Sequence, residues 1–292
     1  MLTKVSKLSD KCMLVKLTIK RAALTKRDNF LTQKVQAQEG DASLTVLTKL
    51  FRDKHSPVAQ IMAAIGEVYE YHRKHTLPYV DAGPRLLLGD TYMEYTADMR
   101  NLIAKADNLK HQWLPQYDQL VLDDIRYRNA GSAAGRACVD DYPSADQFDR
   151  STSIEYRFSP MPDTRHFLFD LSDEDLANFE KAEQEAAAVA AADTVARMMK
   201  PLHSLVERLK EYQGQKGERF HNSLIQNVIE GCDLAEKLAI SPTPELINEI
   251  HTIRDTAKAC LADAEIIKGS AHARDAARAK LEAVAARMSA FG

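Results

Sequence analysis

Two histidines three residues apart, His72 and His75 in the stretch YEYHRKHTLPY, are the first side chains in this 292-residue sequence that could do chemistry. On a helix such a pair lies on one face and could supply two ligands to a metal ion. A metal site needs further ligands at a recognisable spacing, but the sequence has no HExxH, no Glu-x-x-His and no paired cysteines. His72 also belongs to an apolar helical stripe. Cations are favoured near the C-terminal end of a helix, which explains two histidines there without a metal ion. We therefore assign no metal ligand.

The glycine-containing stretch GSAAGRAC (131–138) and the cysteines offer no better catalytic site. A P-loop needs GxxxxGK[ST] between a strand and a helix, and this stretch has neither the Lys-Ser/Thr pair nor a preceding strand. The four cysteines are far apart and belong to no CxxC pair or nucleophile elbow (Cys12, Cys138, Cys232 and Cys260). We expect them to be free thiols in a reducing compartment. Adjacent acids such as Asp123 and Asp124 diverge on a helix. The sequence thus predicts no catalytic residue, no cofactor and no enzyme.

The basic N-terminal region is the best candidate for binding a ligand. Residues 1–54 hold twelve Lys and Arg against five acidic residues, a net charge of +7, whereas residues 140–185 have a net charge of −9. Five basic residues could line the first predicted strand and the loop after it (Lys16, Lys20, Arg21, Lys26 and Arg27). They could bind an anionic partner such as nucleic acid, dock against the acidic region, or simply form a solvated face. Phe30 is the only aromatic residue in 1–50, so the segment offers little for base stacking.

Two short segments have the period-two alternation of half-buried strands. Apolar and polar residues alternate over residues 14–20 (LVKLTIK) and again over 154–158 (IEYRF). Phe167 and Phe169 indicate a third short strand near 166–169. Because a lone strand or a single hairpin is marginally stable, we expect the first two strands to pair in a small antiparallel sheet.

Helical periodicity begins at Pro57, with Ser56 as the expected N-cap. The longest signal follows, from about residue 91 to 128, where apolar residues repeat at spacings of three and four like the a and d positions of a heptad. This first seam comprises Tyr92, Tyr95, Met99, Leu102, Leu109 and Trp113, with Ala106 between the last leucines. One helix of that length, kinked at Pro115, would be about 55 Å long and would need packing partners throughout.

An alanine-rich helix should begin after Ser172, whose spacing to Asp175 is a capping signal. It carries a second seam of Val195, Met198, Leu202, Leu205 and Leu209. Pro201 lies within this seam and is expected to kink or break the helix, because proline has no N–H to donate. Three more helices should follow, and the last one, near 270–290, is expected to dock on the chain or pair with another subunit.

These elements predict a mainly α fold, an elongated antiparallel bundle of long, coiled-coil-like helices with a small antiparallel sheet. One division would separate an α+β part, 1–172, which contains the basic strand and the long helix 91–128, from a helical part, 173–292; a single domain is the alternative. Long seams favour a homo-oligomer, with both seams as candidate interface residues. The sequence has no apolar run long enough to span a membrane and no convincing secretory signal, so we expect a cytoplasmic protein with no membrane partner.

Four stretches together resemble a family of phage and bacterial proteins known as a domain of unknown function. They are CMLVKLTIKRAALTKRDN, WLPQYDQLVLDDI, IEYRFSPMPDTRHFLFDL and KPLHSLVERL, within residues 8–230. Members of that family are often encoded beside a MoxR-type AAA+ ATPase and a von Willebrand factor A-like protein. The resemblance implies a phage or prophage origin, the cytoplasm of a host cell and an AAA+ partner. It carries over no catalytic residue, because none is established for the family.

The leading expectation is a non-enzymatic, phage-type adaptor or scaffold that self-assembles through its long helices and partners an AAA+ ATPase. A nucleic-acid-binding protein that uses the basic N-terminal region is the first alternative. A structural component of the virion is the second.

Overall fold

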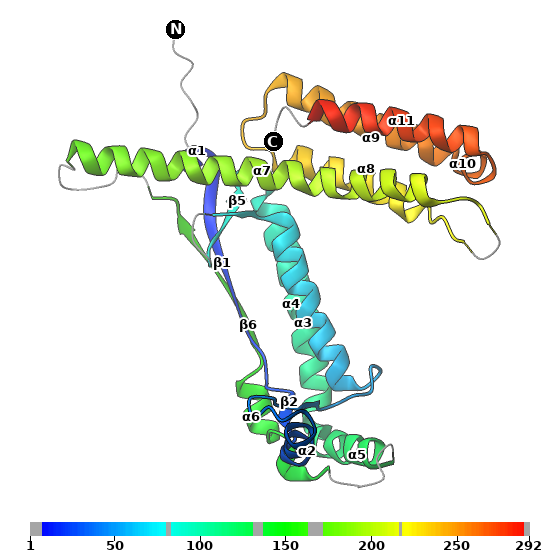
Figure 1. Cartoon of the computed structure of the whole chain (residues 1–292). Helices are drawn as coiled ribbons and strands as arrows, with labels where there is room; N and C mark the ends of the chain where they lie inside the picture. Colours follow the sequence, from blue (N-terminus) through cyan, green and yellow to red (C-terminus); the bar gives the residue numbers. More distant parts are fainter. Residues whose placement is uncertain (1–7, 80–82, 131–136, 163–171, 216–217, 289–292) are drawn as a thin grey trace. The chain divides into compact units, whose positions relative to one another are not determined.

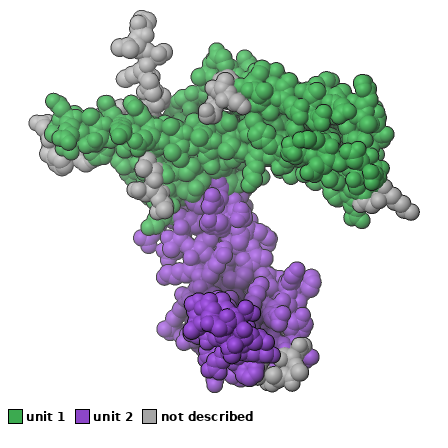
Figure 2. Space-filling model, in the orientation of Figure 1, with its two compact units in different colours: residues 1–16, 74–93, 158–292 green, residues 17–73, 94–157 purple. Residues whose placement is uncertain are grey.

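A computed structural model describes residues 8–79, 83–130, 137–162, 172–215 and 218–288. The fold is mainly α with a small antiparallel sheet, as the sequence predicts. Contacts divide the chain into a first compact unit, residues 1–16, 74–93 and 158–292, and a second, residues 17–73 and 94–157 (Figure 2). The expected boundary at residues 172 and 173 stays a prediction, since these units are defined by contacts and not by independent folding.

The elements follow one another along the chain, and most of them are labelled in Figure 1. The strands are β1 (Cys12–Lys20), β2 (Thr25–Arg27), β3 (Leu47–Lys49), β4 (Leu77–Pro78), β5 (Arg85–Leu88) and β6 (Ser153–Pro160). The α-helices are α1 (Leu8–Lys11), α2 (Asn29–Glu39), α3 (Pro57–His75), α4 (Tyr92–Trp113), α5 (Tyr117–Ala130), α6 (Ala145–Arg150), α7 (Asp173–Glu211), α8 (Ser223–Leu238), α9 (Pro244–Ala262), α10 (Ala264–Gly269) and α11 (Ala271–Met288). Three 3-10 turns lie at Gly89–Thr91, Leu114–Gln116 and Val139–Asp141. Among the described residues, no helix combines the length and apolar character needed to cross a membrane.

The larger sheet has the strand order β4-β5-β1-β6. Its strands β1 and β6 confirm the two predicted strands and their pairing. Strand β5 pairs antiparallel with β1, from Cys12 opposite Leu88 to Val15 opposite Arg85. The sequence of β5, RLLL, has no period-two alternation, and its three leucines are all buried. The third expected strand, 166–169, lies outside the described residues.

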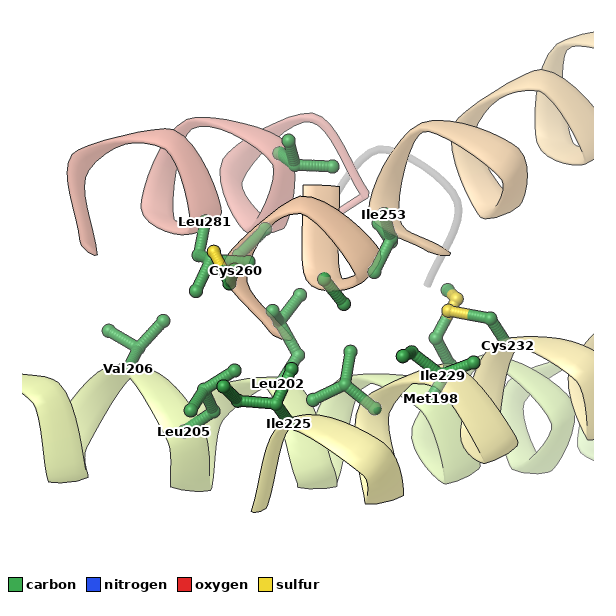
Figure 3. Close-up of a cluster of buried hydrophobic side chains, with 14 of the residues drawn as sticks. Met198, Leu202, Leu205, Val206, Ile225, Ile229, Cys232, Ile253, Cys260 and Leu281 are labelled. Carbon is green, nitrogen blue, oxygen red and sulfur yellow. The ribbon is translucent and has the colours of Figure 1, made fainter. Parts of the chain in front are cut away.

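Four long helices of the first unit, α7, α8, α9 and α11, pack around one apolar core (Figures 1 and 3). Side chains from all four meet there, and the second seam of α7 forms one wall of it (Figure 3). Fully buried members include Met198, Leu202, Leu205, Ile225, Val228, Cys232, Ile253, Ala257, Leu281 and Met288. The terminal helix therefore docks on its own chain, one of the two arrangements expected for it.

The α7 helix runs unbroken through Pro201, so the break, one of the two outcomes predicted there, does not occur. Proline at position 201 leaves the carbonyl of Arg197, four residues earlier, without its usual helical donor. Gly231 of α8 packs at this place, and a Cβ atom on it would lie 3.1 Å from the Arg197 oxygen and 3.6 Å from the Pro201 ring. A residue without a side chain thus lets α8 cover the irregular turn closely, and packing on both sides keeps α7 continuous.

The single long helix predicted over 91–128 is wrong in a different way, because α4 and α5 are separate helices. The 3-10 turn Leu114–Gln116 interrupts them at Pro115. Tyr117 begins α5 and is buried, with its ring 4.9 Å from that of Phe148 and 5.9 Å from that of Phe51 between centroids. Tyr117 at the start of α5 therefore packs into the aromatic core of the second unit. A continuous straight helix could not place it there.

Helix α3 begins as expected. Ser56 accepts a hydrogen bond from the amide of Ala59 at 3.2 Å, which confirms it as the N-cap. At its C-terminal end, Arg197 donates to the carbonyls of Lys74 at 2.5 Å and Thr76 at 2.8 Å. These acceptors lie where the helix leaves carbonyls unpaired, so the guanidinium supplies donors to the end of the helix.

Candidate anion-binding site

The candidate site is built on a two-stranded sheet of the second unit. Helix α2 lies in the connection between the two strands. Strand β2 pairs antiparallel with β3, with Lys26 opposite Thr48, and side chains opposite each other share a face of the sheet. Helix α2 connects the strands; Asp28 caps its first turn by accepting from the Leu31 amide at 2.9 Å. The helix ends at Gly40, whose φ of +69° suits a residue without a Cβ atom. This short unit brings Lys26 and Arg27 next to residues from β3 and α5.

A cavity of about 280 Å³ opens beside this sheet. It is lined by Lys26, Arg27, Asp28, Asn29, Leu31, Thr48, Arg52, Arg128, Asn129, Ala137 and Asp141. Four of these side chains are cationic and two are acidic, so the lining has a formal excess of positive charge. Asp28 already caps α2, so the start of that helix contributes little net positive potential. The excess comes from the basic side chains, and the cavity is suited to an anion.

Asp141 engages two of the four cations. Its carboxylate, with the side chain only 5% exposed, forms an ion pair with Lys26 and lies 3.7 Å from Nη1 of Arg128. It also accepts from the Sγ of Cys138 at 3.3 Å and the Cys138 amide at 3.4 Å. Burial alone would raise the pKa of Asp141, but the hydrogen bonds from Lys26 and Cys138 lower it below its ordinary value. The pKa of Lys26 is raised, chiefly by its hydrogen bond to Asp141.

Arg52 is placed in the cavity by a buried carboxylate on α5. Asp124 is 6% exposed and accepts from the amide of Phe51 at 2.8 Å and from the amide of Arg52 at 3.1 Å. Phe51 has a φ of +49°, in the left-handed region that a bulky side chain rarely adopts. Two successive amides converge on one carboxylate as they would on a bound anion. This arrangement offsets the backbone strain and fixes the start of the loop that carries Arg52.

Tyr142 connects the two parts of the cavity wall. Its hydroxyl donates to Asp124 at 2.6 Å and accepts from Nη1 of Arg128 at 3.0 Å. Burial, followed by the hydrogen bond to Asp124, raises the pKa of Tyr142 to about 12. The ring also packs against Phe51, with 5.3 Å between centroids. Arg128 is therefore held in a fixed position, with its side chain 11% exposed, whereas the side chain of Lys26 is 45% exposed.

The structure brings two of the five predicted basic residues to this cavity and leaves three outside it. Lys26 and Arg27 line it, while Lys16, Lys20 and Arg21 are exposed and do not. Among the described residues, one ion pair joins the basic region to the acidic region, Lys26 with Asp141.

Arg52 and Arg128 also line the cavity, and neither was among the residues predicted from the sequence. The alternation of Leu44, Val46, Thr48 and Leu50 could have indicated β3, and with it the place of Arg52 directly after the strand. Nothing local marks Arg128, because it reaches the cavity only through the packing of α5.

The seam residues lie in different surroundings. In the second seam Val195, Met198, Leu202, Leu205 and Leu209 are buried by the chain's own α8, α9 and α11. In the first seam Tyr95 and Met99 are buried, and Tyr92, Leu102, Leu109 and Trp113 are partly exposed. Tyr92 lies edge-to-face with the half-buried Phe158, with 5.1 Å between ring centroids. Packing within the chain thus accounts for the second seam without a second subunit.

His72 and three of the four cysteines take structural positions. His72 is buried, with Nδ1 2.7 Å from the hydroxyl of Tyr95. Within the described parts of the chain, no three His, Cys, Asp or Glu side chains are arranged to hold a metal ion. Cys12, Cys232 and Cys260 are buried free thiols, and burial raises the pKa of all three, to about 11 for Cys12 and about 12 for Cys232. These three thiols are thereby kept unreactive.

Comparisons of the chain with family models, with curated proteins and with solved structures found no match. The resemblance to the phage family therefore stays an expectation.

Proposed function

We propose that this protein binds the phosphate groups of a nucleic acid, and that the cavity beside β2 and β3 holds one of them. The observation that carries the proposal is the convergence of Lys26, Arg27, Arg52 and Arg128 on one cavity. Guanidinium groups suit phosphate because their planar donors match its oxygens. Arg27 and Arg52 make no ion pair with any residue that the structure describes, so a ligand need not displace a protein carboxylate from them.

Exposed basic residues of the second unit favour a ligand larger than a small anion. Lys20, Arg21 and Lys49 are exposed, and Lys49 lies on β3, paired with Thr25 of β2. A polymer with a phosphate at every residue can use such charges together with the cavity, and each contact adds to the dependence of binding on salt. A single inorganic phosphate could use only the cavity.

The test is the affinity of the full chain for a short single-stranded DNA, measured by fluorescence anisotropy at several salt concentrations. We expect Arg52→Gln and Arg27→Gln each to weaken binding about tenfold. Lys54→Gln is the matched control, because Lys54 is exposed, two residues from Arg52 and outside the cavity lining. Duplex DNA and inorganic phosphate serve as competitors. Binding that is unaffected by either arginine change, or no salt-sensitive binding at all, would overturn the proposal.

An adaptor that serves an AAA+ ATPase is the second candidate. The first three turns of α7, residues 173–185, carry six acidic side chains and one lysine, and nearly all of them are exposed. An exposed acidic helix is a suitable docking surface for a basic partner. The MoxR-type partner itself rests on the family resemblance, and co-purification of the two proteins tests it. Reversal of Asp173, Glu174 and Glu180 to lysine should abolish an interaction made through this segment.

Self-assembly is part of the same adaptor hypothesis. Because the second seam is used within the chain, an oligomer would have to use the first seam or other surfaces. Size-exclusion chromatography with light scattering decides this point, and a strict monomer at high concentration would rule out a scaffold built from copies of the chain.

A further inference from the structure

We infer that Asp141 is a built-in competitor for the ligand, an internal carboxylate that occupies the place of a phosphate oxygen and is displaced when a phosphate binds. This inference rests on the proposed function, since it concerns the same cavity. Asp141 lines the cavity, and its carboxylate pairs with Lys26 while lying 3.7 Å from Arg128. One carboxylate thus engages two of the four cations, and the other two are left for the ligand.

The surroundings of Asp141 show why its carboxylate stays at the cavity in the free protein. It ends the 3-10 turn Val139–Asp141, and the amide and Sγ of Cys138 point at it from the start of that turn. Its pKa is lowered, so it is ionised throughout the physiological range of pH. An ionised, largely buried carboxylate among cations competes with any anion that enters.

The two cations differ in how easily Asp141 can release them. Arg128 is largely buried and is also held by the hydroxyl of Tyr142 at 3.0 Å. Lys26 is 45% exposed, and Asp141 is the carboxylate with which the structure pairs it. Lysine has a flexible stem and donors that rotate, so Lys26 can change partner at little cost. We expect Lys26 to transfer from Asp141 to the ligand's phosphate first.

Two substitutions of neighbouring acids separate this mechanism from a general effect of charge. Asp141→Asn removes the competitor, whereas Asp140→Asn removes the same charge from an exposed residue outside the cavity lining. We expect Asp141→Asn to tighten binding of single-stranded DNA about tenfold and Asp140→Asn to change it less than about twofold, since screening weakens exposed charges. The salt dependence should steepen by roughly one contact, about 0.7 in logarithmic slope for a single strand.

A double-mutant cycle with Lys26→Gln provides a second measurement. The coupling between the two substitutions can be interpreted even when Asp141→Asn lowers the stability of the protein. In the wild type, Lys26→Gln should have a small effect, because the lysine exchanges one anion for another. In the Asp141→Asn background the same change should remove most of the gain in affinity. Circular dichroism of each variant checks that it is folded.

The outcomes distinguish failure of this inference from failure of the proposed function. If the wild type binds and Asp141→Asn binds no more tightly than Asp140→Asn, Asp141 is no competitor, although the cavity still binds phosphate. If only Asp141→Asn binds, the competitor is strong enough to mask the site, and the inference is supported. If neither protein binds at low salt, the proposed function and this inference both fall.

Discussion

The apolar core of the first unit and the polar cluster around Asp124 in the second are both buried, yet they are built from opposite materials. In the first, Met198, Leu202 and Leu205 are fully buried among other apolar side chains. In the second, a carboxylate, a tyrosine hydroxyl and two backbone amides meet at one point, beside a residue with positive φ. Apolar packing is tolerant of rearrangement, whereas a buried polar cluster is stable only when every donor has its acceptor.

This difference indicates what each region is for. A core of the first kind stabilises long helices and requires no particular orientation of any group. A cluster of the second kind gives little net stability, because desolvation offsets its hydrogen bonds, but it fixes geometry. Here the fixed parts are the loop that carries Arg52 and the side chain of Arg128, two of the four cavity cations. The polar cluster is therefore best understood as the support of the candidate site.

The largest expected effect comes from the apolar core. Leu202→Ala should lower the free energy of unfolding by about 3–5 kcal/mol, because Leu202 is fully buried and alanine leaves a cavity. Chemical denaturation of the full chain measures this change. The matched control is Leu176→Ala on the same helix, where the side chain is 36% exposed and the loss should stay below about 1 kcal/mol. Equal losses at the two positions would contradict this account of the core.

Removing the charge of Asp124 should have the next largest effect, about 2–3 kcal/mol for Asp124→Asn. Three donors face this carboxylate: the amides of Phe51 and Arg52 and the hydroxyl of Tyr142. An asparagine would turn its own NH₂ group toward at least one of them. Denaturation measures the loss of stability, and a parallel binding titration should show weaker binding of single-stranded DNA because Arg52 loses its support.

Asp123→Asn is the control for that experiment, since Asp123 is the preceding residue but 54% exposed. We expect it to change stability by less than about 0.5 kcal/mol and to leave affinity nearly unchanged. If Asp124→Asn weakened neither stability nor binding, the polar cluster would not be the support of the cavity.

Two glycine-to-alanine substitutions within helices should change the stability of the protein in opposite directions. Gly231→Ala should destabilise the protein by about 1–3 kcal/mol, because its Cβ atom would meet the Arg197 carbonyl at 3.1 Å where α8 crosses Pro201. Gly66→Ala in α3 should stabilise it by about 0.5–1 kcal/mol, because nothing lies within 4 Å of the new atom and alanine favours helix. Thermal unfolding of both variants tests the pair, and a stabilising Gly231→Ala would show that the close approach to α7 is not required.

Local patterns predicted the elements that depend on local interactions. The alternation in LVKLTIK and IEYRF, the capping residues Ser56 and Ser172, and the periodicity after Pro57 are all confirmed. Patterns failed where packing between distant segments decides the outcome. The break at Leu114–Gln116 depends on the burial of Tyr117 among aromatic rings, and the continuity of α7 depends on Gly231 of another helix.

The candidate site divides in the same way. The charge of the N-terminal region pointed to Lys26 and Arg27, which line the cavity. Arg52 and Arg128 join them only because Asp124 and Tyr142 hold the 50–52 loop against α5, a contact between residues more than seventy positions apart in the case of Asp124 and Phe51. A charge count shows that a region is basic, but only the folded chain shows which cations converge.

A further small effect concerns Tyr142 at alkaline pH. Its pKa is raised from the ordinary 10.0 to about 12, first by burial and then by the hydrogen bond to Asp124, so folding favours the neutral phenol. Its contribution to stability is therefore complete below pH 10 and is lost as the pH rises from 10 towards 12. Tyr142→Phe should cost about 1 kcal/mol near neutral pH, and this difference from the wild type should shrink over that range.

Burial also raises the pKa of Tyr71 and Tyr117, so the wild type and the variant both weaken, and the difference between them is the quantity to measure. Tyr127→Phe, at a side chain 59% exposed, is the control and should follow the wild type at every pH. A difference for Tyr142→Phe that stays constant from pH 9 to 12 would mean that the hydroxyl is not committed to Asp124, and the polar cluster would lose the member that links Asp124 to Arg128.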